Sequence, residues 1–162
     1  MDKYSTMLEE FYKIKVKDIM TPGWNTPFLE ENAGWKEFLT VLSFSTHAWV
    51  VNNTKDMKIA GVITEHDIMH YVIPQERKKE RISGMYRLDV LHKESIVKEI
   101  MTPNPIACLD DENLGDVLQK LSTYDIRRLP VVDKGKRLVG EITIQHLVKN
   151  LRYKFMHGET EG

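Results

Sequence analysis

The segment "GVITEHDI", residues 61–68, carries the side chains best placed for chemistry. An apolar run ends at Thr64, where a helix is predicted to begin, and Asp67 follows three positions later. This spacing is typical of a helix cap, in which Thr64 satisfies a backbone N–H near residue 67 and the carboxylate opposes the positive helix end. An exposed carboxylate at such a junction can also accept hydrogen bonds from both hydroxyls of a ribose, and a helix N-terminus favours a nearby phosphate. The spacing allows both interpretations.

The elements that must position this segment occur twice in the chain. "VKDIMTP" at 16–22 recurs as "VKEIMTP" at 97–103, and "GVIT" at 61–64 recurs as "GEIT" at 140–143. Each copy reads as an "MTP" turn, a short extended piece, an amphipathic helix, two β-branched runs that form a hairpin, and a final helix. One copy has too few elements to cover both faces of its sheet. The sequence therefore predicts an α+β fold in which two β-α-β-β-α units pack sheet to sheet about a pseudo-twofold axis.

Domain boundaries follow from the repeat. The repeats are placed at residues 16–70 and 97–150, after a helix at 1–15 that sets Tyr4, Met7, Leu8 and Phe11 on one face. Residues 71–96 form a helical connector, and 151–162 form a tail. The "ERKKER" run of the connector is interpreted as a solvated helix face, with a phosphate-binding patch as the alternative.

Composition narrows the function classes. The net charge of −1 over 162 residues provides no positive field for nucleic acid or anionic lipid, so nucleic-acid binding is disfavoured. No apolar run approaches the roughly 20 residues of a membrane span, and the N-terminus does not resemble a secretion signal. The single cysteine, Cys108, is expected to pack as a small hydrophobe. These features predict a cytoplasmic protein that does not associate with membranes.

Beyond spacing, the two units closely resemble a known family. Tandem copies of the form "VK(D/E)IMTP … RRLPVVD … LVG.IT" resemble the cystathionine-β-synthase (CBS) domain, and the pair resembles a Bateman module, over roughly residues 14–150. The resemblance implies a stand-alone regulatory module that binds an adenosine ligand, commonly AMP, ADP, ATP or S-adenosylmethionine, in a cleft between the motifs. It also implies a homodimer and a signal to a regulated protein that the sequence does not identify.

The resemblance also implies the binding residues. The ribose is held by Thr64 and Asp67, and Val62 lines the base. The facing motif contributes the base-contacting stretch and two phosphate-binding cations, namely Thr102, Ile106, Ala107, Arg127 and Arg128. Two arginines favour phosphates over the cationic S-adenosylmethionine. The alternative for both arginines is an ordinary surface ion pair with Asp125 or Asp133.

The opposite cleft departs from the family pattern. Thr143 is retained, but Glu141 replaces an apolar residue and His146 stands where the ribose carboxylate belongs. A neutral imidazole cannot accept two hydrogen bonds from a diol, and a buried Glu141 repels phosphate. In the facing stretch, His47 is the only basic side chain. We therefore expect this cleft to be empty or filled by side chains such as Trp49.

Other chemistries have less support. His66 and His70 have a spacing that can bind zinc, but no third ligand is evident, so no metal site is predicted. No combination of nucleophile, base and orienting group suggests an enzyme. The alternative to a ligand sensor is a dimerisation or protein-interaction scaffold whose two clefts are vestigial.

Overall fold

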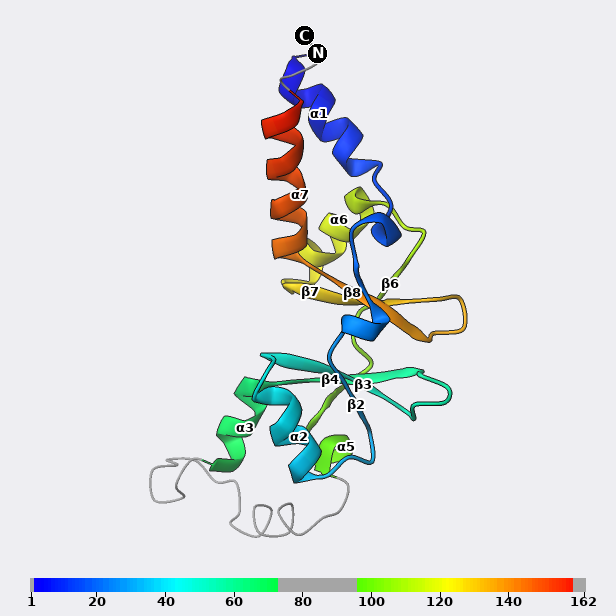
Figure 1. Ribbon diagram of the computed structural model, residues 1–162, viewed down its shortest axis with the longest axis vertical. Coiled ribbons are helices and arrows are strands. Elements are labelled where there is room, and N and C mark those ends of the chain that lie inside the picture. The colour runs from blue at the N-terminus through cyan, green and yellow to red at the C-terminus, as the bar shows by residue number, and fades with distance from the viewer. Residues whose placement is uncertain (1, 73–95, 159–162) are drawn as a thin grey trace. The chain divides into compact units, whose positions relative to one another are not determined.

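A computed structural model describes residues 2–72 and 96–158 of the chain (Figure 1). It divides into two compact units, each built from both repeats. Residues 1–26 and 106–162 form one, here called the terminal unit, and residues 27–105 form the other, the central unit. The connector predicted at 71–96 lies outside the described residues except at its ends.

The terminal unit contains a four-stranded sheet in the order β1-β8-β7-β6. The predicted hairpin around "KGK" is confirmed, because β7 and β8 pair antiparallel and the Asp133 carboxylate accepts hydrogen bonds from the N–H groups of Gly135 and Arg137 in the turn. The strands are β1 (Thr21–Pro22), β6 (Cys108–Leu109), β7 (Arg128–Val132) and β8 (Leu138–Thr143).

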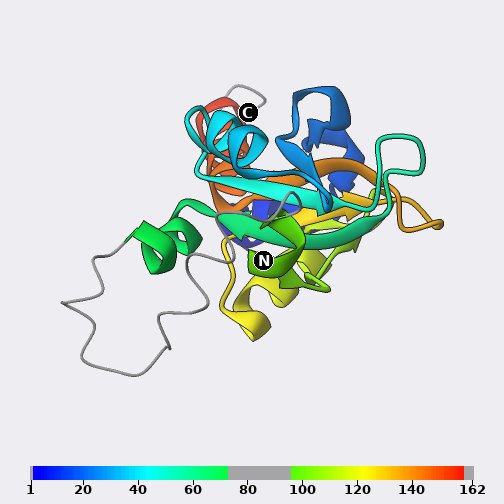
Figure 2. The same cartoon turned by 90° about the horizontal axis from the view of Figure 1, so that it is seen from below.

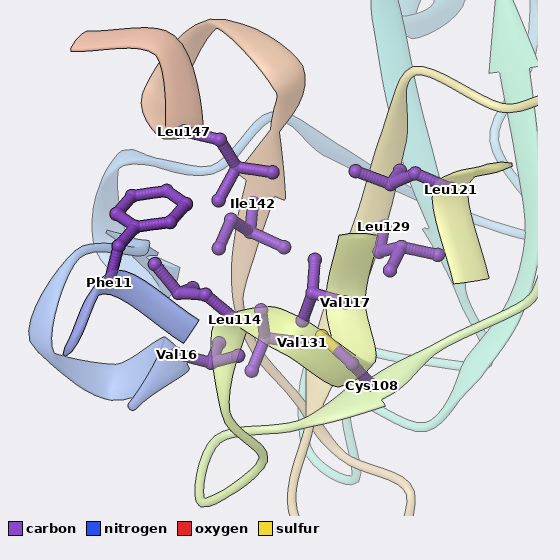
Figure 3. Close-up of a cluster of buried hydrophobic side chains, with 10 residues drawn as sticks. All are labelled: Phe11, Val16, Cys108, Leu114, Val117, Leu121, Leu129, Val131, Ile142 and Leu147. Carbon is purple, nitrogen blue, oxygen red and sulfur yellow. The ribbon is translucent and has the colours of Figure 1, made fainter. Parts of the chain in front are cut away.

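Helices cover one face of this sheet and complete its core. They are α1 (Lys3–Tyr12), α6 (Leu114–Tyr124) and α7 (Ile144–His157), with short 3-10 turns η1 (Val16–Asp18) and η2 (Gly23–Asn25). Figure 3 shows ten buried side chains converging from these helices, from η1 and from the sheet. The face predicted for the first helix is divided, since Met7 and Phe11 are buried whereas Tyr4 stacks on Phe155 with ring centroids 5.5 Å apart.

The central unit contains a second four-stranded sheet, in the order β2-β3-β4-β5. Its strands are β2 (Phe28–Glu30), β3 (His47–Val51), β4 (Ile59–Thr64) and β5 (Thr102–Pro103), and its helices are α2 (Trp35–Leu42), α3 (Glu65–Val72) and α5 (Ile96–Ile100). In Figure 2, α3 (green) continues from the end of β4. The predicted α+β class is confirmed by these two mixed units.

The two "MTP" segments, predicted as turns, are instead short edge strands. β1 pairs with β8 and β5 pairs with β4, so each segment joins the sheet that holds the other repeat's hairpin. An edge strand tolerates proline because the missing N–H faces no neighbour. Val16 and Val97, which precede these strands, enter the same cores. Each core therefore contains residues of both repeats.

Glycine is required where these edge strands meet the hairpins. A Cβ on Gly61 would lie 2.8 Å from the Thr102 carbonyl oxygen, and one on Gly140 would collide with the Thr21 carbonyl oxygen. The backbones approach too closely for any side chain. This explains the glycine that begins both "GVIT" and "GEIT".

Candidate functional site

The junction between β4 and α3 holds the predicted ribose-binding pair. The Thr64 backbone N–H donates to Oδ2 of Asp67 at 2.7 Å, and the Thr64 hydroxyl donates to the same oxygen at 3.3 Å. This is the reciprocal of the predicted cap, because the carboxylate of Asp67 satisfies the backbone of Thr64. The cap requires a hydrogen-bond acceptor at this position, and one carboxylate oxygen provides it.

Capping uses only one oxygen of Asp67. Both hydrogen bonds that Asp67 makes within the described residues fall on Oδ2, and its side chain is half-buried. An ionised carboxylate offers about four lone-pair sites, so Oδ1 retains its capacity to accept hydrogen bonds. The capping and ligand-binding interpretations are therefore compatible.

Two further predicted residues lie in the same sheet. Val62 and Thr102 are register partners on β4 and β5. Because side chains alternate along a strand, Val62 and Thr64 share one face of β4 while Ile63 points into the core. The central unit thus brings together Val62, Thr64, Asp67 and Thr102, four of the eight predicted residues.

The other four predicted residues belong to the terminal unit. Ile106 and Ala107 lead into β6, which runs parallel to β7 with Cys108 opposite Val131. Arg127 and Arg128 stand at the start of β7, where the Arg127 carbonyl accepts a hydrogen bond from the first residue of α7.

Neither arginine forms the ion pair considered as an alternative. Arg127 is exposed and Arg128 is half-buried, and across residues 2–72 and 96–158 no carboxylate lies within salt-bridge distance of them. Asp133 instead accepts backbone hydrogen bonds in the hairpin turn. Asp125 ends α6 in the left-handed conformation, with φ of 50°. Both guanidinium groups therefore remain available for an anion as far as the described residues show.

Sequence reasoning did not single out Lys120, a residue of α6 in the terminal unit. Lys120 Nζ donates to the Ala107 carbonyl oxygen at 3.0 Å and to both Glu112 carboxylate oxygens, at 2.7 and 2.9 Å. Lys120 lies on an amphipathic helix at a position that reads as solvent-facing, so no periodicity or motif marks it. Only the fold reveals that it contacts the predicted base-binding stretch.

The junction between β8 and α7 has the same architecture with a different acceptor. The N–H of Thr143 donates to Nδ1 of His146 at 3.1 Å, and the N–H of His146 donates to the Thr143 hydroxyl at 3.2 Å, forming a reciprocal capping box. Nε2 of His146 lies 3.0 Å from the Thr21 hydroxyl. Since Nδ1 accepts, Nε2 carries the proton of the neutral ring and donates to Thr21. Both ring nitrogens are therefore engaged.

The surroundings of His146 favour the neutral ring. Burial lowers the pKa of His146 below its usual 6.5, an effect that the Glu141 carboxylate opposes and Lys149 reinforces. The expected burial of Glu141 is confirmed, since it is 7% exposed. His47 and Trp49 are also buried, in β3 of the central unit. That Trp49 fills the second cleft stays a prediction.

Cys108 lies in the core of the terminal unit. Cys108 is 1% exposed, and burial raises its pKa to about 12, so the thiol stays protonated as expected for a packing residue. Residues 2–72 and 96–158 contain no cluster of three metal-ligating side chains. The side chain of His70 lies outside the described residues.

Comparison with known proteins identifies the family. A family model for the CBS domain matches residues 16–74 and 97–153, which is most of the chain. This chain belongs to the CBS domain family. The tandem motifs make it a CBS pair, as the sequence resemblance predicted.

Solved CBS pairs share its fold. CBSX2 from Arabidopsis thaliana, crystallised in complex with AMP, is 25% identical with a TM-score of 0.67, and the match covers 86% of this chain and 97% of CBSX2. The CBS domain pair of protein MJ0100, in complex with 5′-methylthioadenosine and S-adenosyl-L-methionine, is 27% identical with a TM-score of 0.60 over 87% of this chain and 98% of that one.

The curated relatives include longer proteins. A homoserine O-acetyltransferase from Methanosphaera stadtmanae is 27% identical over 137 residues, covering 83% of this CBS pair and 24% of the relative. This chain thus spans about a quarter of the length of the first curated relatives that it matches. Among the described residues, no helix has the length and apolar character needed to cross a bilayer.

Proposed function

We propose that this CBS pair is a regulatory module that binds an adenine nucleotide, AMP, ADP or ATP, and signals to a partner protein through a change in conformation. The observation that carries the proposal is the junction at Asp67. There a half-buried carboxylate caps its helix with Oδ2 and keeps Oδ1 for a ligand. A carboxylate oxygen beside the Thr64 hydroxyl suits the vicinal hydroxyls of a ribose.

Solved relatives support the choice of an adenosine group. AMP, 5′-methylthioadenosine and S-adenosyl-L-methionine, which are bound by the two CBS pairs compared above, all contain adenosine. A phosphorylated ligand is favoured here because Arg127 and Arg128 make no ion pair within the described residues. Guanidinium groups bind phosphate oxygens in bidentate geometry and repel a sulfonium cation.

The roles of the individual residues follow from this chemistry. We assign the ribose to Thr64 and Asp67. We assign the base to Val62, Thr102, Ile106 and Ala107. We assign the phosphates to Arg127 and Arg128. Binding changes the conformational equilibrium only if one arrangement of the protein holds the nucleotide more tightly than another.

Calorimetric titration tests the proposal. AMP, ADP, ATP and S-adenosylmethionine are titrated into the wild-type chain and into Asp67→Ala, which we expect to weaken nucleotide binding roughly ten- to a hundredfold because it removes charge-assisted hydrogen bonds. Asp111→Ala is the matched control, since it removes one exposed carboxylate from the loop before α6. It is expected to leave affinity unchanged.

Two results would contradict the proposal. If the wild-type chain gives no heat with any of these ligands, the interaction scaffold becomes the better interpretation. If Asp67→Ala and Asp111→Ala bind equally well, the nucleotide binds without Asp67. A ligand that binds only the native state must also raise the melting temperature, which provides an independent check.

A further inference from the structure

The ammonium group of Lys120 uses all three of its N–H donors in hydrogen bonds within the terminal unit. Its three N–H donors match three acceptors, the Ala107 carbonyl oxygen and the two carboxylate oxygens of Glu112. Both partners of the ion pair are partly buried, with side chains 30% and 22% exposed. The carboxylate is itself held in place, because the Glu112 backbone accepts from the N–H of Val16 and donates to the Leu109 carbonyl. Lys120 therefore tethers α6 to the chain that enters β6.

The tether acts where the sheet gives the backbone least support. β6 is an edge strand of two residues, Cys108 and Leu109, so a carbonyl on its outer side has no neighbouring strand. Lys120 donates a hydrogen bond to the carbonyl of Ala107, the residue that directly precedes this strand. Because the peptide group is planar, fixing this carbonyl also fixes the N–H of Cys108 in the opposite direction.

The neighbours of Ala107 indicate which way its side chain faces. Cys108 is buried in the core and Ile106 packs against that core. Side chains alternate in extended chain, so Ala107 faces away from the core that its two neighbours contact. A small apolar side chain in this orientation leaves room for contact with an aromatic base.

We propose that Lys120 is a positioning residue for base recognition, which acts on the ligand only through the backbone of Ala107. This inference rests on the proposed function, in which the stretch up to Ala107 contacts adenine. Lys120 does not act as a phosphate-binding cation, because Glu112 neutralises its charge and its three donors are occupied. Its removal should therefore weaken binding of the base and leave the contribution of the phosphate unchanged.

The test uses three probes that separate base from phosphate. Adenosine, AMP and ribose 5-phosphate are titrated into the wild-type chain, Lys120→Met and Lys120→Arg by NMR chemical-shift titration. Lys120→Met should lower the affinities for adenosine and for AMP by the same factor, about three- to tenfold, since one charged hydrogen bond to the backbone is lost. The affinity for ribose 5-phosphate should not change. Lys120→Arg retains a donor and should restore part of the affinity.

Two control variants exclude a general effect of charge. Lys134→Met removes an exposed lysine from the hairpin turn and should leave the affinity for adenosine unchanged. Glu112→Gln removes the neutralising charge and keeps an acceptor for Lys120. If Lys120 bound the phosphate, Glu112→Gln would raise the affinity for AMP relative to that for adenosine. If Lys120 only positions Ala107, the ratio of the two affinities should not change. Glu112→Gln also provides this test if Lys120→Met fails to fold.

The outcomes separate this inference from the proposed function. If the wild-type chain binds none of the three probes, both the proposed function and the inference about Lys120 are contradicted. If the wild-type chain binds adenosine and AMP, and Lys120→Met binds each of them as tightly as the wild type does, only the inference about Lys120 is overturned. Loss of affinity for AMP without loss for adenosine, or equal losses for all three probes, would also overturn it, because these results indicate a phosphate contact or a general structural role.

Discussion

The two strand-to-helix junctions solve one structural problem with different side chains. At both, the third helical residue accepts a hydrogen bond from the N–H of a preceding threonine, with Oδ2 of Asp67 in the central unit and Nδ1 of His146 in the terminal unit. The difference lies in the second polar atom. Oδ1 of Asp67 has no partner within the described residues, whereas Nε2 of His146 already donates to Thr21.

This difference shows that capping and ligand binding impose separate requirements. An imidazole nitrogen or a carboxylate oxygen can satisfy a helix terminus, so the cap alone does not select aspartate. A second open acceptor is needed to bind a diol, and only the carboxylate provides it. The junction at Asp67 thus has the second acceptor that the proposed ribose contact requires, and the junction at His146 does not.

Exchanging the two side chains should produce the largest effect. Asp67→His keeps an acceptor for the Thr64 N–H and removes the open carboxylate oxygen, so we expect nucleotide binding to fall by roughly a hundredfold with the fold retained. Calorimetry with AMP measures the affinity, and far-UV circular dichroism checks the fold. Retention of wild-type affinity would show that the comparison of the two junctions has no functional meaning.

The reciprocal exchange should not create a second site. His146→Asp provides the missing carboxylate, but Glu141 stays buried beside it and repels a phosphate. We therefore expect calorimetry to give the same number of nucleotides per chain as for the wild type. If His146→Asp bound a second equivalent of AMP, then His146 alone, without Glu141, would prevent nucleotide binding at this junction in the wild type.

The glycines before the two junctions should differ in their tolerance of substitution. A Cβ at Gly140 collides with the Thr21 backbone carbonyl, whereas a Cβ at Gly61 first meets the flexible Met101 side chain and lies 2.8 Å from a carbonyl. Each alanine variant should lose about 1–3 kcal/mol of unfolding free energy, with Gly140→Ala the worse. Urea denaturation measures both. A larger loss for Gly61→Ala would contradict this ranking.

Sequence reasoning succeeded where a local pattern determines the structure. Helical periodicity and the polar "KGK" turn led to the α6 helix and the β7–β8 hairpin, and the family resemblance identified the CBS pair. The burial of Glu141 was also expected, because it stands where the family pattern has an apolar residue.

The failures concern contacts between residues far apart in the chain. The "MTP" segments were predicted as turns because proline marks turns, and their pairing with the other repeat's strand has no local signal. The hydrogen bond from His146 to Thr21 joins residues 125 positions apart, and the one from Lys120 on α6 to Ala107 joins residues 13 positions apart. Such partners are chosen by tertiary packing, which a single sequence does not reveal.

The smallest expected effect is a pH dependence of the unfolding free energy that arises from His146 in the terminal unit. The folded state lowers the pKa of His146 below 6.5, so the fold favours the neutral ring that the Thr143 N–H requires. The stabilisation is fully present above the unfolded-state pKa and is lost as the pH falls through the lowered, folded-state value, because the unfolded chain then binds the extra proton. The unfolding free energy of the wild type should therefore decline with acidification in this window.

Comparison with His146→Asn isolates this contribution from the other histidines. Asparagine keeps an oxygen acceptor at the position of the cap and does not titrate, so the wild-type advantage over the variant should shrink as the pH falls below about 6.5. Urea denaturation at a series of values between about pH 5 and 8 measures the difference. A difference that stays constant over this range would mean that the ring accepts its second proton in the folded state as readily as in the unfolded chain. In that case the Nδ1 cap does not distinguish this junction from the one at Asp67.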